Sequence, residues 1–387
     1  MQIGLVGKPS SGKSSFFKAS TMIDVAIADY PFTTIKPNIG MGYVVTDCVC
    51  KYYDVKCNPK NSVCVNKKRY IPIKLIDVAG LVPDAHLGKG LGNQFLDDLR
   101  QASCLIHIVD ASGKTDAEGK VTSGYDPSND IRFLTREIDL WFAGIVKKGM
   151  AKYAVKKNFS KVDLVDILTN QLTGLGITKE DIQQGLDKSS INNIEEFATE
   201  LRSLSKPIII AANKIDLLGS EENLKKIKKE FPNLTIIPTS AAAEIALKGA
   251  DKKGLIEYNH DSFTIKDESK MDIKQVEGLK FIDEKVLKKY GSTGIQECLN
   301  KAVFDVLDYI VVYPVADVNK MTDSKGNILP DAFLVKNGTT LKEFAFSIHS
   351  DIGEKFIGGL EAKTKRKIGA EYILQNNDVI EILFQKR

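Results

Sequence analysis

The chain has 387 residues, of which 54 are Lys or Arg, 50 are Asp or Glu, and 43% are hydrophobic. This length predicts two or three domains, and the near balance of charge excludes a protein that binds nucleic acid through its overall charge. No apolar run is long enough to span a bilayer, and the amino terminus enters a predicted strand without a basic signal region. We therefore expect a cytoplasmic protein with no membrane partner.

A phosphate-binding loop follows the first predicted strand. Residues 2–6 have the composition of a short buried strand, and residues 7–14 read Gly-Lys-Pro-Ser-Ser-Gly-Lys-Ser. Gly7 and Gly12 allow successive backbone N–H groups to point at a polyphosphate. Lys13 supplies charge for the β and γ phosphates, and Ser14, where a helix should begin, offers a hydroxyl ligand for Mg²⁺. The residues expected to hold a nucleoside triphosphate are Gly7, Ser10, Ser11, Gly12, Lys13, Ser14 and Ser15.

Two further segments are placed to sense the γ phosphate. Residues 71–76 form an apolar strand that ends at Asp77, which is expected to hold Mg²⁺ through water. The amide of Gly80 is expected to contact the γ phosphate. Upstream, residues 30–34 read Tyr-Pro-Phe-Thr-Thr, and Thr34 is the predicted second Mg²⁺ ligand. Lys13, Thr34 and Gly80 are therefore candidate catalytic residues.

The base is predicted from a motif far downstream. Residues 206–212 read as a buried strand that ends in Asn213-Lys214-Ile215-Asp216. The carboxylate of Asp216 can accept two hydrogen bonds from guanine, whereas adenine would leave it unpaired. Asn213 is expected to brace the loops, and Lys214 to lay its stem across the base. A strand at 235–238 leads to Ser240 and Ala241, whose backbone N–H suits the guanine O6, so GTP and GDP are the predicted ligands.

Four of the six cysteines, Cys48, Cys50, Cys57 and Cys64, lie close together and are separated by one, six and six residues. Four thiols can hold zinc, although the usual paired spacing of ligands is missing. Three interpretations stay open: a zinc site, one or two disulfides, or reduced thiols. Cys104 and Cys298 lie in apolar stretches and are expected in the core.

The middle of the chain contains more residues than one crossover helix needs. Residues 112–129 read as a loop, and apolar residues at three- and four-residue spacing predict helices within 131–145, 164–172, 182–186 and 194–204. Six lysines of this region either contact RNA phosphates or form a solvated face. They are Lys147, Lys148, Lys152, Lys156, Lys157 and Lys161. A second mainly helical region is expected over residues 243–303.

The last part of the chain changes to strands. Residues 309–314 and 332–335 read as strands, and the Thr340–Glu343 spacing of a capping box predicts a helix from Leu341. Residues 372–374 and 379–384 are predicted to close the sheet as a hairpin. A basic cluster is either an RNA-binding surface or a solubilising one, and its members are Lys363, Lys365, Arg366 and Lys367.

The motifs at 7–14, 30–34, 77–82 and 90–98, in this order, resemble those of the Obg-like GTPases, and within them the YchF subfamily in its archaeal form. The resemblance covers the whole chain. It implies a P-loop NTPase fold: a Ras-like α/β domain with a mostly parallel sheet and helices on both faces (residues 1–305), and a helical insertion (roughly 112–205). It also implies a C-terminal β-grasp (TGS) domain (306–387) and a role linked to ribosomes or RNA.

Three features of the sequence differ from those of related GTPases. Many relatives lose the guanine motif and prefer ATP, but Asn213, Lys214 and Asp216 are all present here, which favours GTP. Ser10 replaces an Asn that helps bind K⁺, which argues against activation by potassium. Leu81 replaces a Gln that orients the attacking water, so slow intrinsic hydrolysis is expected. His86 is a candidate for this task, or a solvated loop histidine.

Two classes of function follow from these residues. The first is a GTPase switch that times binding to ribosomes or RNA. The second is a nucleotide-gated scaffold with negligible turnover, which Leu81 keeps open. An ATPase is a lesser variant of the first class, and Asp216 argues against it.

Overall fold

The structure, a computed structural model, describes residues 1–22, 38–78, 92–151 and 161–385. These residues form two compact units. The first contains residues 1–22, 38–41, 74–78, 92–151 and 161–298, and the second contains residues 42–73 and 299–385. The domain boundary between residues 305 and 306 stays a prediction. No helix in the described ranges is both long and apolar enough to cross a bilayer.

A seven-stranded sheet has the strand order β2-β4-β1-β5-β6-β7, with β3 paired to β4. The pairs that join β4, β1, β5, β6 and β7 are all parallel. Every residue of β5 and β6 is buried, which requires cover on both faces of the sheet. The strands are β1 (Gln2–Val6), β2 (Ile39–Asp47), β3 (Val63–Val65), β4 (Lys68–Asp77), β5 (Cys104–Asp110), β6 (Ile208–Asn213) and β7 (Thr235–Pro238). This arrangement confirms the predicted α/β class.

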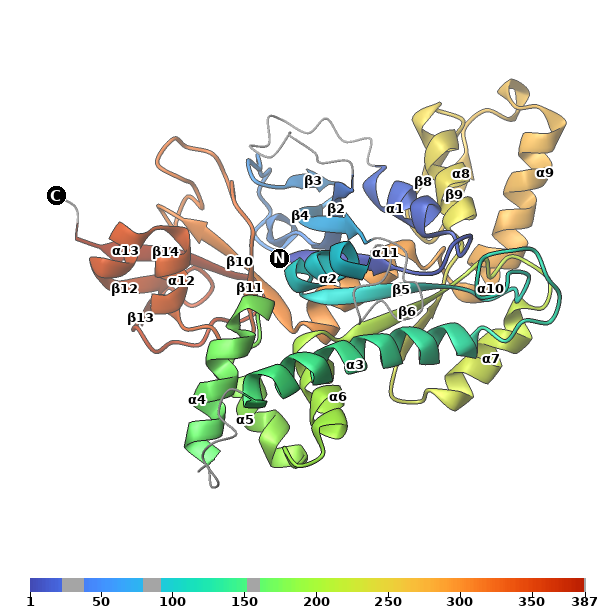
Figure 1. The fold of residues 1–387 in the computed structure, drawn as a ribbon. Coiled ribbons are helices and arrows are strands. Elements are labelled where there is room, and N and C mark those ends of the chain that lie inside the picture. Colours follow the sequence, from blue (N-terminus) through green and yellow to red (C-terminus); the bar gives the residue numbers. More distant parts are fainter. Residues whose placement is uncertain (23–37, 79–91, 152–160, 386–387) are drawn as a thin grey trace. The chain divides into compact units, whose positions relative to one another are not determined.

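Helices cover this sheet. α1 (Lys13–Thr21) packs against α8 (Ala241–Lys252), and α3 (Ser128–Ala151) packs against α6 (Ile194–Ser205). Figure 1 shows α3 running beneath β5 and β6, with α1 above them. α2 (Gly92–Gln101) shares a buried core with α3 and the sheet, which includes Leu99, Leu105 and Phe142. The parallel strands therefore end in loops at an edge between two helical layers.

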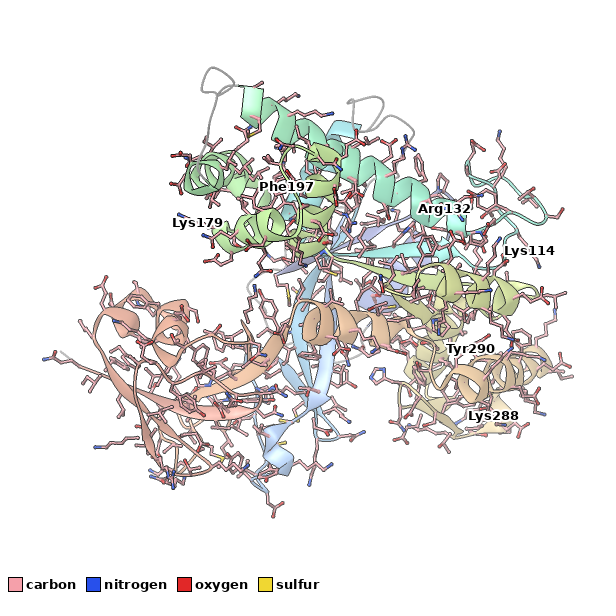
Figure 2. All side chains as sticks on the ribbon, turned by 90° about the horizontal axis from the view of Figure 1, so that it is seen from below. Lys114, Arg132, Lys179, Phe197, Lys288 and Tyr290 are labelled. Atoms are coloured by element: carbon pink, nitrogen blue, oxygen red, sulfur yellow. The ribbon has the colours of Figure 1, made fainter. Side chains whose placement is uncertain are left out.

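The predicted helical insertion is present as α3, α4 (Lys161–Leu172), α5 (Lys179–Lys188) and α6, with a short 3-10 turn at Thr173–Leu175. Thr178 starts α5 with a capping box, because its side chain accepts from the Asp181 N–H and the Asp181 side chain accepts in return. Phe197 is fully buried and lies among these helices in Figure 2, whereas Lys179 faces outward.

The rest of the first unit surrounds a smaller core that includes Leu247, Ile256 and Val286. A two-stranded hairpin, β8 with β9, interrupts the helical region that the sequence predicts. The elements are α7 (Ser220–Glu230), β8 (Ile256–Tyr258), β9 (Phe263–Ile265), a 3-10 turn (Glu268–Lys270), α9 (Ile273–Ile282), a π-helical turn (Asp283–Leu287), α10 (Lys288–Tyr290) and α11 (Ile295–Asn300).

The second unit contains a five-stranded sheet in the order β11-β10-β14-β12-β13, with β10 and β14 parallel. α12 (Leu341–Ile348) packs its Phe344 into the core of this sheet, and Thr340 and Glu343 form the predicted capping box. The other elements are a 3-10 turn η1 (Val49–Lys51), a π-helical turn (Lys301–Val306), β10 (Tyr309–Val315), β11 (Phe333–Lys336), α13 (Ser350–Glu354), β12 (Phe356–Glu361), β13 (Lys367–Ile368) and β14 (Asp378–Phe384). Strands around one helix are the predicted β-grasp arrangement.

The predicted hairpin of residues 372–374 with 379–384 is wrong. Ile373 makes only an isolated bridge to Thr340, and the antiparallel partner of β14 is β12. The sequence does not predict β12 because this strand contains Gly358 and Gly359, and glycine has a low strand propensity. Gly359 is needed there, since a Cβ atom would lie 2.8 Å from the side chain of Leu341 on α12.

Candidate nucleotide-binding site

The loop after β1 has a backbone that only glycine fits at two positions. A Cβ atom on Gly7 would lie 2.6 Å from the carbonyl oxygen of Ile108 on β5. A Cβ atom on Gly12, at φ +94°, would lie 2.2 Å from the amide nitrogen of Asn213. Ser10 also has a left-handed backbone, at φ +61°. Left-handed residues within a turn direct neighbouring N–H groups inward, which gives the concave backbone that holds phosphate oxygens.

The first turn of α1 places its polar side chains beside the end of β4. α1 begins at Lys13, and the ammonium of Lys13 forms an ion pair with the carboxylate of Asp77. Ser14 and Ser15 follow on this turn and are exposed, whereas Ser11 is buried. Mg²⁺ prefers carboxylate and hydroxyl oxygens, so Ser14 and Asp77 fit the ion that the sequence predicts.

Asn213 joins three loops at the edge of the sheet. Its side-chain amide donates to the carbonyl of Ser11 (3.0 Å), and its oxygen accepts from the Ala241 N–H (3.1 Å). The side chain is buried, so these bonds are shielded from water. The phosphate-binding loop, the end of β6 and the start of α8 therefore lie together, as the bracing role predicted for Asn213 requires.

The remaining residues of the predicted guanine motif lie on the same edge. Lys214, at φ +62°, donates to the carbonyl of Ser10 (2.7 Å), so its stem lies over the phosphate-binding loop. Asp216 is half-buried and accepts from the Ser240 hydroxyl (2.7 Å). Ser240 also caps α8, where its oxygen accepts from the Ala243 N–H (3.2 Å). The carboxylate of Asp216 is therefore held by one partner and keeps further acceptor capacity.

Asp110 belongs to this site and was missed. It ends β5 and is fully buried, and its carboxylate pairs with the ammonium of Lys214 (2.8 Å). Ser112 (2.6 Å) and Thr115 (2.8 Å) also donate to it. Burial would raise the pKa of Asp110, but the hydrogen bonds from Lys214, Ser112 and Thr115 outweigh it and lower the pKa. An aspartate at the carboxyl end of a buried parallel strand was the available signal.

Lys8 is a second residue of this site that the sequence analysis does not predict. It occupies a position of the phosphate-binding motif at which the motif specifies no residue type. Its ammonium is nearly buried, pairs with Asp130 (2.9 Å), donates to the carbonyl of Thr115 (2.8 Å) and lies 3.9 Å from the centre of the Tyr125 ring. Tyr125 in turn donates to Asp130 (2.7 Å). Burial raises the pKa of Asp130 although both neighbours donate to it. These contacts fix the back of the phosphate-binding loop to the segment before α3.

Several predicted residues lie outside the described ranges, and their roles stay predictions. These are Thr34, Gly80, Leu81 and His86 of the γ-phosphate segments, and Lys152, Lys156 and Lys157 of the insertion. The side chain of Lys161 is also outside them. Lys147 and Lys148 are exposed on α3.

The four clustered cysteines belong to the second unit and are all free thiols. The closest sulfur pairs are Cys48 with Cys57 at 3.9 Å and Cys50 with Cys64 at 3.8 Å. A disulfide bond is about 2.05 Å long, so neither pair is bridged in the structure. Cys104 and Cys298 are buried in the core as predicted.

A phosphate-binding loop on a parallel sheet, with an Asn-Lys-x-Asp turn beside it, defines a P-loop nucleotide-binding domain of the GTPase class. Family models agree in chain order: a 50S ribosome-binding GTPase over residues 2–137, the G4 motif-containing domain of YGR210-like Obg-like GTPases over 211–317, and a TGS domain over 325–384. A GTP-binding protein of Methanocaldococcus jannaschii is 51% identical over 98% of each chain. The protein belongs to the YchF family of Obg-like GTPases with a TGS domain.

Two further relatives are similar to this chain over nearly its whole length. The crystal structure of a GTP-binding protein from Pyrococcus horikoshii matches with a TM-score of 0.79 and 40% identity, and covers 100% of both chains. The ribosome-binding ATPase YchF of Bacillus subtilis is 28% identical over 98% of each chain. The names of the relatives include both GTP-binding proteins and ATPases, so membership alone establishes a P-loop nucleotide hydrolase family and leaves the base to be argued from residues.

Proposed function

We propose that this protein binds and slowly hydrolyses GTP and acts as a nucleotide-dependent switch on ribosomes or RNA. The observation that carries the proposal is the pair of hydrogen bonds in which Asn213 donates to Ser11 and accepts from Ala241. These bonds bring the phosphate-binding loop and the two base loops to one edge. A single nucleotide can therefore reach Lys13 with its phosphates and Asp216 with its base.

The choice of GTP over ATP rests on Asp216. Ser240 occupies one acceptor position of this carboxylate, and the guanine N1–H and N2–H₂ groups would satisfy others. Adenine offers neither donor at these positions, and a site that leaves a polar group unpaired rejects the wrong analogue by roughly 10⁴-fold. Relatives named ATPases occur in the family, so this carboxylate is the feature on which we base the assignment.

Binding of the triphosphate requires Lys13 to change partners. Its ammonium is paired with Asp77 in the structure. We infer that the β and γ phosphates replace Asp77 as the partner of Lys13, which frees the carboxylate to hold Mg²⁺ together with Ser14. The bound ion supplies positive charge to the β and γ oxygens. In this proposal, Thr34 is the second Mg²⁺ ligand from the protein and the Gly80 amide contacts the γ phosphate.

Slow turnover is proposed because Leu81 cannot orient the attacking water. The side chain of Leu81 has no polar atom, whereas His86 is close enough in sequence to supply one. Mutation of His86 to Ala and single-turnover hydrolysis of GTP test this role. A rate equal to that of the wild type excludes a catalytic role for His86.

The partner is proposed to be ribosomal RNA or another RNA, which places the protein's action in the cytoplasm. The turn after β12 and the first residue of β13 expose four basic side chains, Lys363, Lys365, Arg366 and Lys367. Exposed Lys and Arg side chains bind phosphates by displacing counterions, so such binding should weaken as salt rises. Ribosome binding is named for the Bacillus subtilis relative.

Titration of GTP and ATP against the wild type and Asp216→Ala tests the choice of base. We expect the substitution to weaken GTP binding by roughly 100-fold or more, while ATP binding changes by less than about threefold. Glu222→Ala is the matched control, because Glu222 is exposed at the start of α7 and makes no predicted contact with the nucleotide. Equal losses of GTP and ATP binding would overturn the guanine assignment.

Hydrolysis with and without ribosomes separates the switch from the nucleotide-gated scaffold. A switch requires that ribosomes accelerate GTP hydrolysis, since turnover must be coupled to the partner. A scaffold binds ribosomes in the presence of GTP with no change in its rate. The variant Lys363→Glu/Lys367→Glu then shows whether the basic turn carries the contact, since loss of ribosome binding without loss of GTP binding is expected.

A further inference from the structure

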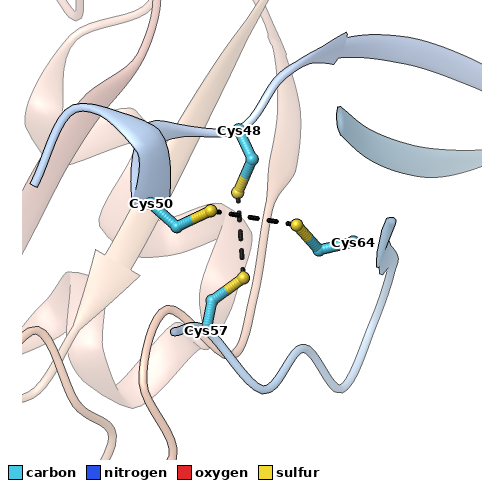
Figure 3. A group of neighbouring side chains, drawn as sticks. All are labelled: Cys48, Cys50, Cys57 and Cys64. Atoms are coloured by element: carbon cyan, nitrogen blue, oxygen red, sulfur yellow. Dashed lines mark hydrogen bonds between the residues drawn. The ribbon is translucent and has the colours of Figure 1, made fainter. Parts of the chain in front are cut away.

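The four clustered cysteines point their sulfur atoms at a common centre. Cys48 follows β2, Cys50 lies in the turn η1, Cys57 in the loop after it, and Cys64 on β3. All four Sγ atoms lie within 4.8 Å of one another. Figure 3 shows them as two crossing pairs, Cys48 with Cys57 and Cys50 with Cys64, that face inward from different segments of the chain.

The separations suit one tetrahedral metal ion. Zinc–sulfur bonds of about 2.3 Å place the sulfurs of a tetrahedral Cys₄ site about 3.8 Å apart. The two crossing pairs are separated by 3.9 Å and 3.8 Å. A tetrahedral set of four sulfurs is the ligand environment of zinc or of iron, and the absence of open ligand positions is typical of structural zinc.

A buried arginine supplies the charge that such a site needs. Arg69 is fully buried, and one of its terminal nitrogens lies 3.9 Å from the sulfur of Cys48. Among the residues that the structure describes, no carboxylate forms a direct ion pair with Arg69, although Asp331 is near enough to interact with its charge. A zinc ion with four thiolates carries net negative charge and would neutralise the guanidinium, and donors beside a metal-bound sulfur orient the ligand.

The same arginine and the loop between Cys57 and Cys64 attach to one segment of the C-terminal part. Arg69 donates to the Leu329 carbonyl (2.8 Å), and the Lys60 N–H donates to the Pro330 carbonyl (2.7 Å). The side chain of Asn61 both accepts from the Ala332 N–H (2.9 Å) and donates to its carbonyl (3.1 Å). The loop that the cysteines enclose is therefore hydrogen-bonded along residues 329–332.

We propose that Cys48, Cys50, Cys57 and Cys64 bind one structural zinc ion, which fixes the 48–64 loop and thereby holds residues 329–332 of the C-terminal part. Arg69 is a positioning residue, which balances the charge and connects Cys48 to the Leu329 carbonyl. Since such a site does not exist in the unfolded chain, the free energy of zinc binding stabilises this part of the fold.

Metal analysis of the full-length protein tests the proposal directly. We expect about one zinc per chain in the wild type after removal of loosely bound metal. In Cys57→Ser/Cys64→Ser, the zinc content should fall at least about tenfold, since two of four ligands are lost. Cys298→Ala is the matched control and should keep its zinc, because Cys298 lies outside the cluster. A wild type that contains no zinc, that contains iron in its place, or whose double variant keeps its zinc overturns the proposal.

A second measurement does not depend on the folding of the double variant. Wild-type protein stripped of metal and titrated with Co²⁺ should reach saturation at about one ion per chain, with the intense thiolate-to-cobalt absorption of a tetrahedral sulfur site. Arg69→Gln should weaken cobalt binding by roughly 10- to 100-fold. Hydrogen exchange at the Lys60 and Ala332 amides should accelerate about tenfold on removal of the metal. Absence of the thiolate absorption, or unchanged exchange, contradicts the proposal.

Discussion

Distant residues come together in two regions: the sheet edge that we assign to the nucleotide, and the cysteine loop (residues 48–64) with Arg69. The two regions differ in how far their polar groups are buried. At the nucleotide edge, Asn213 and Asp110 are buried and fixed, while Ser14 is exposed and Asp216 is half-buried. Beside the clustered cysteines, Arg69 is fully buried and each of its three nitrogens donates to a partner within the fold. The first arrangement leaves polar groups open for a ligand. The second encloses them, which suits a structural role.

The largest expected effect is a loss of GTP affinity at the nucleotide edge of the sheet. Lys13→Ala should weaken binding of GTP by roughly 1,000-fold, because the charge opposite the β and γ phosphates is lost and charged partners in a site contribute about 2–5 kcal/mol. Calorimetric titration measures it. Lys18→Ala, an exposed lysine in the last turn of the same helix, is the control and should bind as the wild type does. An affinity within threefold of the wild type for Lys13→Ala contradicts the phosphate assignment.

A substitution of the buried Arg69 should change the stability of the fold and leave the nucleotide affinity unchanged. Arg69→Met should lower the free energy of unfolding by about 3 kcal/mol, because Ser62 and the Leu329 carbonyl lose their donor and stay buried. Denaturant unfolding measures it, with GTP affinity unchanged. Lys68→Ala is the control, since its ion pair with Asp47 is more than half exposed and should contribute less than about 1 kcal/mol. Equal effects of the two substitutions would contradict the enclosed role of Arg69.

A smaller effect on nucleotide affinity is expected from the ion pair between Asp110 and Lys214. Asp110→Asn keeps one acceptor oxygen, enough for either Ser112 or Thr115, and removes the charge that holds Lys214. We expect GTP and GDP to bind about tenfold more weakly, since one ion pair no longer fixes the lysine over the base. Asp126→Asn, which loses only an exposed ion pair with Lys226, should change binding less than twofold. If both variants bind alike, Asp110 does not position Lys214.

The smallest expected effect is a change in how folding stability depends on pH. It comes from His107 on β5, a strand of the large sheet. Burial lowers the pKa of His107 to about 3, from about 6.5 in the unfolded chain. The unfolded chain therefore takes up a proton first, so stability is full above pH 6.5 and is lost as the pH falls from there toward 3. Between pH 7 and 5.5, the wild type should therefore lose about 1 kcal/mol more of its free energy of unfolding than His107→Gln does. Parallel stability curves for both proteins would contradict this.

The sequence predicts the nucleotide edge well because its motifs are local. Gly7, Gly12 and Lys13 have a fixed spacing dictated by the backbone that holds phosphates, and Asn213 to Asp216 are contiguous. Asp110 and Lys8 were missed because their partners, Lys214 and Asp130, are more than one hundred residues away in the chain. No periodicity encodes such pairs.

The C-terminal part and the cysteine loop were predicted less completely for the same physical reason. α12 has a local capping box and was found, whereas β12 contains two glycines and was missed. The sequence shows the four cysteines close together, but their spacing leaves zinc, disulfides and reduced thiols all open. Their mutual arrangement depends on the turn at η1, and the fixing of their loop depends on residues 329–332, which lie far downstream.

The proposed function depends on the binding of a guanine base and its phosphates at one edge of the sheet. Calorimetry of the wild type with GDP and with ADP, each in the presence of Mg²⁺, tests it most directly. We expect GDP to bind at least roughly 100-fold more tightly than ADP, because only guanine satisfies the Asp216 carboxylate. Equal affinity for the two nucleotides, or no binding of either, would contradict it.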